Sequence, residues 1–185
     1  MKKLVCFGDS ITAREQSNDG TNRLTPRLRS GLVGWEVINA GVSGDNTRDA
    51  LLRVEEDVLA HSPNLVTILL GANDAATHKM IELEEYSDNL LHIIKKITPQ
   101  KAILITPSPV DEQRPRNRTN ASLQGYANVV KHIANSMGSQ FVDLFSKMIK
   151  QPDYIEMLSD GLHFTEPGYI FLSQLLLNKI KDIQT

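Results

Sequence analysis

The feature that most constrains the fold is a set of short apolar runs without polar alternation. The clearest is LVTILL, at residues 65–70. A strand with one solvated face alternates apolar and polar residues, whereas a strand covered on both faces reads as a continuous apolar run. These runs therefore predict a parallel sheet with helices on both sides. The predicted strands are 4–7, 35–40, 65–70, 102–106 and 141–145.

Segments between these runs carry apolar residues at three- and four-residue spacing, which is typical of helices that lie on a sheet. Thr25-Pro26 predicts a helix capped by Thr25 with Pro26 at its first position. A helix is also expected to begin at Ser10. Alternating strands and helices predict an α/β fold with about five parallel strands, and 185 residues suit one domain over 1–185. The apolar stripes begin at Leu24, Leu51, Leu83, Leu123 and Tyr169.

Composition excludes several classes of protein. The net charge is −2, so no basic excess attracts nucleic acid or an anionic membrane. The single cysteine, Cys6, excludes a disulfide framework and a multi-cysteine metal site. No apolar stretch approaches the ~20 residues of a membrane helix, and no signal peptide precedes the first strand, so a cytoplasmic location is expected. No feature of the sequence specifies an oligomeric state.

Small and polar residues follow the predicted strands. In doubly wound sheets ligands bind beyond the carboxyl ends of the strands, so function is expected there. The topology would bring these segments to one edge of the sheet. They are Gly8-Asp9-Ser10, residues 41–47 (GVSGDNT), Gly71-Ala72-Asn73-Asp74 and, after the fifth strand, residues 159–163 (SDGLH).

Ser10 is a candidate nucleophile only if the chain also supplies a base and a group that orients the base. Of the five histidines, His163 is favoured, because Asp160 lies three residues before it and Gly161 permits a tight turn between them. His78 ranks second. An Asp-x-x-His segment is otherwise commonly a turn with a surface histidine.

An acyl-transfer site also needs hydrogen-bond donors for the oxyanion. The candidates are the Ser10 amide, the Gly44 amide and the neutral side-chain amide of Asn73. The alternative is structural: Gly44 only makes a turn, and Asn73 with Asp74 only caps the next helix.

Four blocks in order resemble the SGNH hydrolases, the GDSL esterase/lipase superfamily: Gly8-Asp9-Ser10-Ile11, residues 41–47, Gly71-Ala72-Asn73-Asp74 and Asp160-Gly161-Leu162-His163. The resemblance implies a flavodoxin-like three-layer sandwich. It implies Ser10 as nucleophile, His163 as base and Asp160 as the group that orients it, with Ser10, Gly44 and Asn73 as the oxyanion hole. Residues 158–164 are most similar to the isoamyl-acetate-hydrolysing esterase branch.

The function expected from this resemblance is hydrolysis of carboxylic esters of small or lipid-like substrates through an acyl-serine, without a cofactor or metal. Lysophospholipids, acyl thioesters and acetylated sugars are alternative substrates. The rival class is a flavodoxin-like binding module for flavin or nucleotide, but the chain has no Gly-x-Gly-x-x-Gly after its first strand and no Gly-Lys-Ser/Thr.

Two loops are expected to shape the acyl and alcohol pockets, residues 12–24 and 107–120. The second carries Arg114, Arg116 and Arg118. A solvated loop is the favoured interpretation of these arginines, and recognition of an anionic substrate group is the alternative.

Overall fold

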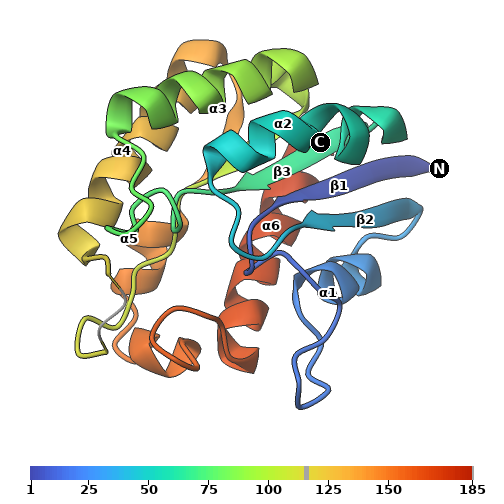
Figure 1. Ribbon diagram of the computed structural model, residues 1–185. Coiled ribbons are helices and arrows are strands. Elements are labelled where there is room, and N and C mark those ends of the chain that lie inside the picture. The colour runs from blue at the N-terminus through green and yellow to red at the C-terminus, as the bar shows by residue number, and fades with distance from the viewer. Residues whose placement is uncertain (115–116, 185) are drawn as a thin grey trace.

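A computed structural model describes residues 1–114 and 117–184, in which one sheet lies between two layers of helices (Figure 1). All neighbouring strands pair in parallel, in the order β2-β1-β3-β4-β5. This is the flavodoxin-like order, so the predicted fold class is confirmed. The strands are β1 (Lys2–Gly8), β2 (Trp35–Gly41), β3 (Leu65–Leu69), β4 (Ala102–Ile105) and β5 (Gln140–Val142).

Helices cover both faces of the sheet. Buried side chains of α2, α3 and α4 pack in one apolar cluster, and those of α1 and α6, joined by α5, pack mainly in the other. Figure 1 shows α2 and α3 above the sheet, with α1 and α6 below it. The helices are α1 (Leu24–Gly31), α2 (Thr47–Asp57), α3 (Leu83–Ile97), α4 (Asn120–Met137), α5 (Leu144–Ile149) and α6 (Glu166–Gln184). Short 3₁₀ turns are η1 (Leu59–His61), η2 (Pro99–Lys101) and η3 (Tyr154–Met157).

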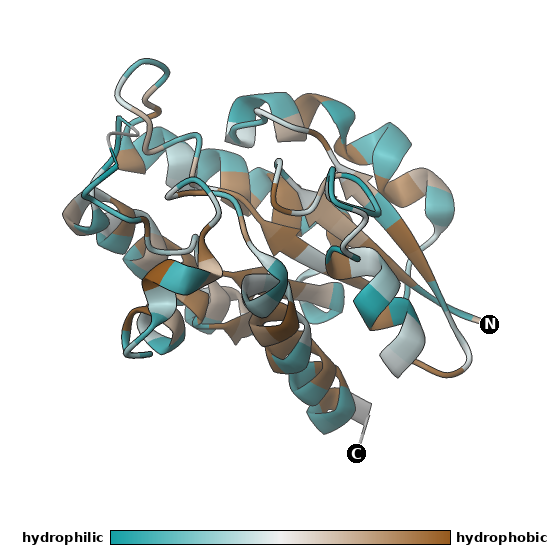
Figure 2. Cartoon of the chain, turned by 90° about the horizontal axis from the view of Figure 1, so that it is seen from below, coloured by the Kyte–Doolittle hydropathy of each residue, from teal (hydrophilic) through white to brown (hydrophobic). Residues whose placement is uncertain are grey.

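The buried strands explain the unalternating runs in the sequence. Every residue of β3 and β4 is buried. Figure 2 shows the apolar colour in the central strands, bands of both colours on the helices and mainly the hydrophilic colour in the outer loops. Because both faces of these strands lie under helices, neither face needs polar side chains.

The fifth strand is shorter than predicted. It ends at Val142, and the Asp143 carboxylate then accepts a hydrogen bond from the Ser146 amide over 3.0 Å at the start of α5. Leu144 and Phe145, predicted as strand, are therefore the first turn of a helix. A short apolar run does not distinguish a buried strand from a buried helix.

The start of the first helix also differs from the prediction. Ser10 lies in a single turn, in which the amides of Thr12 and Ala13 donate to the Asp9 carbonyl over 3.1 and 2.9 Å. No helix begins there, and the first helix begins at Leu24.

Thr25 does not cap α1. The N-cap residue is Arg23, which makes no side-chain capping bond. The buried Thr25 hydroxyl instead donates to the Glu15 carboxylate over 3.0 Å. A tertiary contact has thus replaced the local cap that the Thr-Pro pair suggested.

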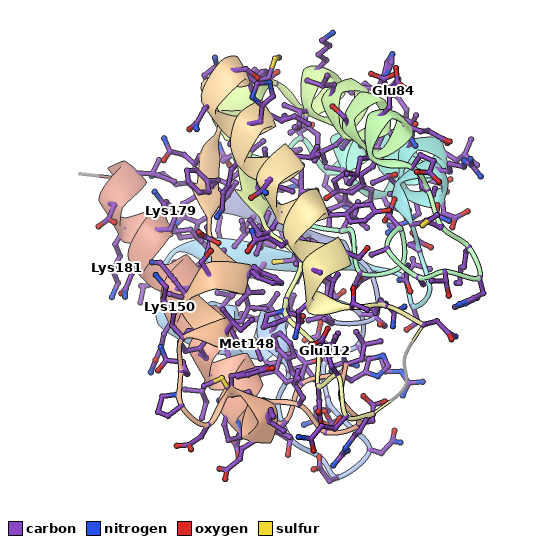
Figure 3. All side chains as sticks on the ribbon, turned by 90° about the vertical axis from the view of Figure 1, so that its left-hand side faces the viewer. Glu84, Glu112, Met148, Lys150, Lys179 and Lys181 are labelled. Carbon is purple, nitrogen blue, oxygen red and sulfur yellow. The ribbon has the colours of Figure 1, made fainter. Side chains whose placement is uncertain are left out.

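Charged side chains stand on the outer surface around α5 and α6. Figure 3 shows Lys150, Lys179 and Lys181 around the ends of α5 and α6, with Lys181 directed away from the protein. Among the helices of the described residues, none combines the length and the apolar character that a membrane crossing requires.

Candidate active site

The candidate site lies at the carboxyl ends of β1 and β3, which are neighbours in the sheet. The chain leaves β1 toward β2 on one side and leaves β3 toward β4 on the other. Such a switch point leaves a crevice at the edge of the sheet. Ser10 follows β1, and Asn73 follows β3, so the topology alone brings both residues to the crevice.

Ser10, His163 and Asp160 form a connected chain of hydrogen bonds. Ser10 Oγ lies 3.0 Å from His163 Nε2, and His163 Nδ1 lies 2.9 Å from Asp160 Oδ2. With its proton on Nδ1, the ring donates to Asp160 and accepts from Ser10. This is the arrangement that a serine nucleophile requires.

The Asp160 carboxylate is held by the loop that also presents His163. Its Oδ1 accepts from the amides of Leu162 and His163 over 3.0 and 2.9 Å. Partial burial raises the pKa of Asp160, but the hydrogen bonds from the His163 ring and from these amides outweigh burial and lower the pKa to about 2. The tight turn rests on Gly161, whose φ of +88° is strained for residues with a side chain.

Gly44 lies in the loop after β2 with φ +92°, a conformation that favours glycine. One bond holds this loop near the nucleophile turn, and a second joins it to the segment after β3. The Val42 amide donates to the Gly8 carbonyl over 3.0 Å, and Lys79 Nζ donates to the Gly44 carbonyl over 3.1 Å. The Gly44 backbone is therefore fixed at the rim of the cleft.

Asn73 is 9% exposed, and its Nδ2 donates to the Asp45 carbonyl over 2.8 Å. A primary amide has two N–H groups, so one remains for a molecule in the cleft. Asn73 caps no helix, because α3 begins ten residues later at Leu83, after its N-cap residue Glu82. The capping alternative for Asn73 is therefore wrong.

Asp74, the neighbour of Asn73, also caps no helix after β3. Its Oδ1 accepts from the amide and the hydroxyl of Thr47, over 2.9 and 2.6 Å. Thr47 is the first residue of α2, so Asp74 ties the loop after β3 to that helix.

A cleft of about 640 Å³ is lined by Ser10, Gly44, Asn73 and His163 together. Every predicted site residue except Asp160 thus faces one space, and Asp160 lies behind His163. Most of the remaining wall is polar and includes Ser17, Asn18, Ser43 and Ser159. Its apolar part is made by Leu162, Phe164 and the ring of Tyr169.

His78, the second-ranked base, does not line this cleft. Its ring is exposed and lies 3.5 Å from the side chain of Asn117. His92 and His132 are exposed on α3 and α4, and His61 ends η1. Across residues 1–114 and 117–184, no group of three or more His, Cys, Asp or Glu side chains has an arrangement that could hold a metal ion.

In the loop after β4, Arg118 is not simply solvated, which corrects the favoured interpretation for that arginine, whereas Arg114 is exposed as expected. Arg118 is half-buried, and its Nε donates to the Ala72 carbonyl, beside Asn73, over 2.7 Å. Arg114 donates to the Ser159 carbonyl, beside Asp160, over 3.0 Å. Neither arginine lines the cleft. Arg116 lies outside the described residues.

Two buried charged residues next to the nucleophile were not singled out by the sequence. The Asp9 side chain is 2% exposed and accepts from the Ile11 amide over 2.9 Å, and burial raises its pKa to about 6. Arg23 is 8% exposed and donates to the carbonyl of Ser10. Asp9 could have been noticed, because it stands inside the first block, but nothing near Arg23 in the sequence points to Ser10.

Residues 6–170 match the sequence family of GDSL-like lipases and acylhydrolases. The chain belongs to this family. It is therefore an ester hydrolase of the GDSL family, and the resemblance seen in the sequence is confirmed. Among curated relatives, the chain is 34% identical to a human isoamyl acetate-hydrolyzing esterase 1 homolog, over 92% of this chain and 77% of that protein. It is 31% identical to an acetylxylan esterase of Geobacillus stearothermophilus, over 97% of this chain and 94% of that protein.

Solved structures agree with this family. A lipase/acylhydrolase from Enterococcus faecalis superposes with a TM-score of 0.91 at 35% identity, over 98% of this chain and 96% of that one. The acetylxylan esterase Axe2 superposes with a TM-score of 0.81 at 28% identity, over 97% and 94% of the two chains. Two further Axe2 structures are catalytic mutants, in which a histidine or a serine is replaced by alanine.

Proposed function

We propose that this GDSL hydrolase cleaves short-chain carboxylic esters through an acyl-enzyme formed on Ser10. The observation that carries the proposal is the distance of 3.0 Å between Ser10 Oγ and His163 Nε2, in a ring whose other nitrogen lies 2.9 Å from Asp160. A serine hydroxyl is a weak nucleophile until a neighbouring base accepts its proton. These three residues therefore take the roles of nucleophile, base and orienting carboxylate.

The reaction has two steps, acylation of Ser10 and hydrolysis of the acyl-enzyme. Ser10 Oγ attacks the ester carbonyl while its proton passes to His163 Nε2, and the carbonyl oxygen becomes an oxyanion. The carbon–oxygen bond to the alcohol then breaks, and His163 gives its proton to the departing alcohol. In the second step water attacks the acyl group with His163 as base, which releases the carboxylic acid and restores Ser10.

The oxyanion is stabilised by the amides of Ser10 and Gly44 and by the second N–H of Asn73. Fixed donors of this kind need no reorganisation when charge develops. The positive φ of Gly44 and the bond from Asn73 to Asp45 support this role, because they hold the donor-bearing loops before substrate binds.

Acetylated sugars are a second substrate class that a specific observation favours. Serine and asparagine side chains line much of the cleft, and they suit a polyhydroxylated alcohol better than a long apolar chain. The acetylxylan esterase relative adds support for an acetyl group as the acyl part.

A fluorophosphonate probe tests the proposed nucleophile, because it phosphonylates activated serines. One mass increment is expected, on the peptide that contains Ser10, with parallel loss of nitrophenyl acetate hydrolysis. Ser43 and Ser159 also line the cleft, so a label on either of them would overturn the assignment. Nitrophenyl esters of increasing acyl length then separate a short-chain esterase from a lipid hydrolase, by whether kcat/KM falls or rises with length.

A further inference from the structure

Two arginines line the cleft beside the proposed nucleophile. They are Arg14 and Arg23, and no Asp or Glu of the described residues lines it with them. Clefts with charge of one sign concentrate ligands of the opposite sign. The net charge of the chain is −2, so the excess of positive charge here is local.

Arg23 is a buried cation with neutral partners only. Its Nε donates to the Tyr169 hydroxyl over 2.5 Å, another nitrogen donates to the Ser10 carbonyl, and its guanidinium carbon lies 5.1 Å from the centre of the Tyr169 ring. Burial raises the pKa of Tyr169 to about 12, so that phenol is neutral. Buried charges in proteins are ordinarily paired, because leaving water without a counter-charge is costly.

Arg14 is an exposed arginine at the rim, where water solvates its charge and a carboxylate partner is not required. Its backbone has φ +67°, its carbonyl accepts from the Asn39 side chain over 3.1 Å, and its guanidinium donates to the Asn18 side chain over 3.3 Å. Among the described residues neither Arg14 nor Arg23 has an ion pair. Other described arginines do form an ion pair with a carboxylate: Arg27, Arg29, Arg48, Arg53 and Arg114.

We infer that the cleft takes esters that carry a carboxylate or another anionic group, which Arg14 and Arg23 bind while Ser10 attacks the ester. The inference rests on the proposed function, since it names the substrate class of that site. The inference assigns anion recognition to the cleft and not to the loop after β4, because Arg114 and Arg118 donate to backbone carbonyls and do not line the cleft.

Matched esters that differ only in charge test this inference. The compounds 3-acetoxybenzoate and 3-acetoxybenzamide vary the charge on the alcohol part, and phenyl 4-carboxybenzoate and phenyl 4-carbamoylbenzoate vary it on the acyl part. Each kcat/KM is divided by the hydroxide-catalysed rate of that ester. In at least one pair we expect a preference of about tenfold for the anion, as for a hydrogen bond between charged groups. The preference should shrink in 0.5 M NaCl.

The variants separate anion binding from positioning of the nucleophile. Arg14→Gln should lower the anion-to-neutral ratio toward one, and Arg23→Gln should lower it as well. Lys181→Gln makes the same charge change on an exposed residue far along α6, and it should leave the ratio unchanged (Figure 3). A wild-type ratio near one in both pairs, or a ratio that survives Arg14→Gln, would overturn the inference, whether or not Arg23→Gln folds.

A binding measurement distinguishes failure of this inference from failure of the proposed function. Ser10→Ala cannot form the acyl-enzyme, so calorimetry can compare the two esters of each pair without turnover. Tighter binding of the anion supports the inference even if the wild type hydrolyses neither ester. Hydrolysis of both esters with equal binding refutes the inference and leaves the proposed function intact.

Discussion

The side-chain amide of Asn73 donates a hydrogen bond to the backbone carbonyl of Asp45 over 2.8 Å. This bond ties the loop after β3 to the loop after β2, which carries Gly44. One residue thus braces the proposed oxyanion hole with one N–H, and in the proposed function its other N–H binds the oxyanion. Removing this side chain should therefore affect both catalysis and stability, and each effect has its own measurement.

Asn73→Ala should lower kcat by about 10²–10³-fold with KM little changed, because the oxyanion carries full charge only after attack. Loss of the bond to Asp45 should also cost about 1 kcal/mol of stability. Asn73→Asp should be slower still, since a carboxylate repels the developing anion. Steady-state kinetics and thermal melting measure the two effects, with Asn128→Ala on α4 as the matched control. A lower melting temperature with normal kcat would show that Asn73 is only a brace.

His163→Ala should lower kcat by about 10²–10⁴-fold while the protein stays folded, because the general base is lost. His78→Ala is the matched control, since His78 is exposed and lies outside the cleft. In the wild type, kcat/KM should fall in acid, because a protonated imidazole cannot accept the serine proton. If the two alanine variants showed the opposite order of activity, the assignment of the base would be wrong.

Arg118→Ala should reduce kcat on every ester alike, since its bond of 2.7 Å holds the Ala72 carbonyl next to Asn73. The sequence had suggested only that this arginine is solvated or recognises an anionic substrate group, so a general loss of turnover would distinguish a positioning role from both. Arg114→Ala is the companion variant and should act through the Ser159 carbonyl and the loop of Asp160. Ester panels with both variants test the idea, and a selective change in KM for charged esters would restore a role in substrate recognition.

The parts of this protein that the sequence predicted follow from local periodicity and from topology. Buried runs and apolar stripes specified the parallel sheet and its helices, and the carboxyl ends of parallel strands necessarily share one edge. Ser10 and His163 could therefore be paired across 153 positions, because the spacing from Asp160 favoured His163 among the histidines and the motif resemblance supported the same residue.

Contacts of long polar side chains were not predictable. Arg23 meets Tyr169 across 146 positions, and Arg118 meets Ala72 across 46. Neither contact leaves a periodic or spacing signal, because a guanidinium reaches its partner by packing and not by register. The prediction that Leu144 and Phe145 lie in a strand was wrong for a different reason, since a strand and a helix follow each other within one apolar run. The single domain and the cytoplasmic location stay predictions.

Asp9 gives the last prediction, which concerns stability and pH. Its carboxyl is 2% exposed, and burial raises its pKa from 3.8 to about 6 despite the hydrogen bond from the Ile11 amide. The folded pKa lies above the unfolded one, so the folded state holds this proton more tightly. The stability that Asp9 contributes is thus present below about pH 4 and is lost as the pH rises through about 6.

Asp9→Asn carries no charge to desolvate, so its free energy of unfolding relative to the wild type should improve by about 1–3 kcal/mol between pH 4 and pH 8. Urea unfolding at one-unit steps of pH measures this difference. Asp153→Asn makes the same change at an exposed site and should give a flat difference across the range. A contrary result would be a free energy of unfolding of Asp9→Asn that falls relative to the wild type as the pH rises. It would mean that the surroundings stabilise the Asp9 carboxylate and that burial does not control its charge.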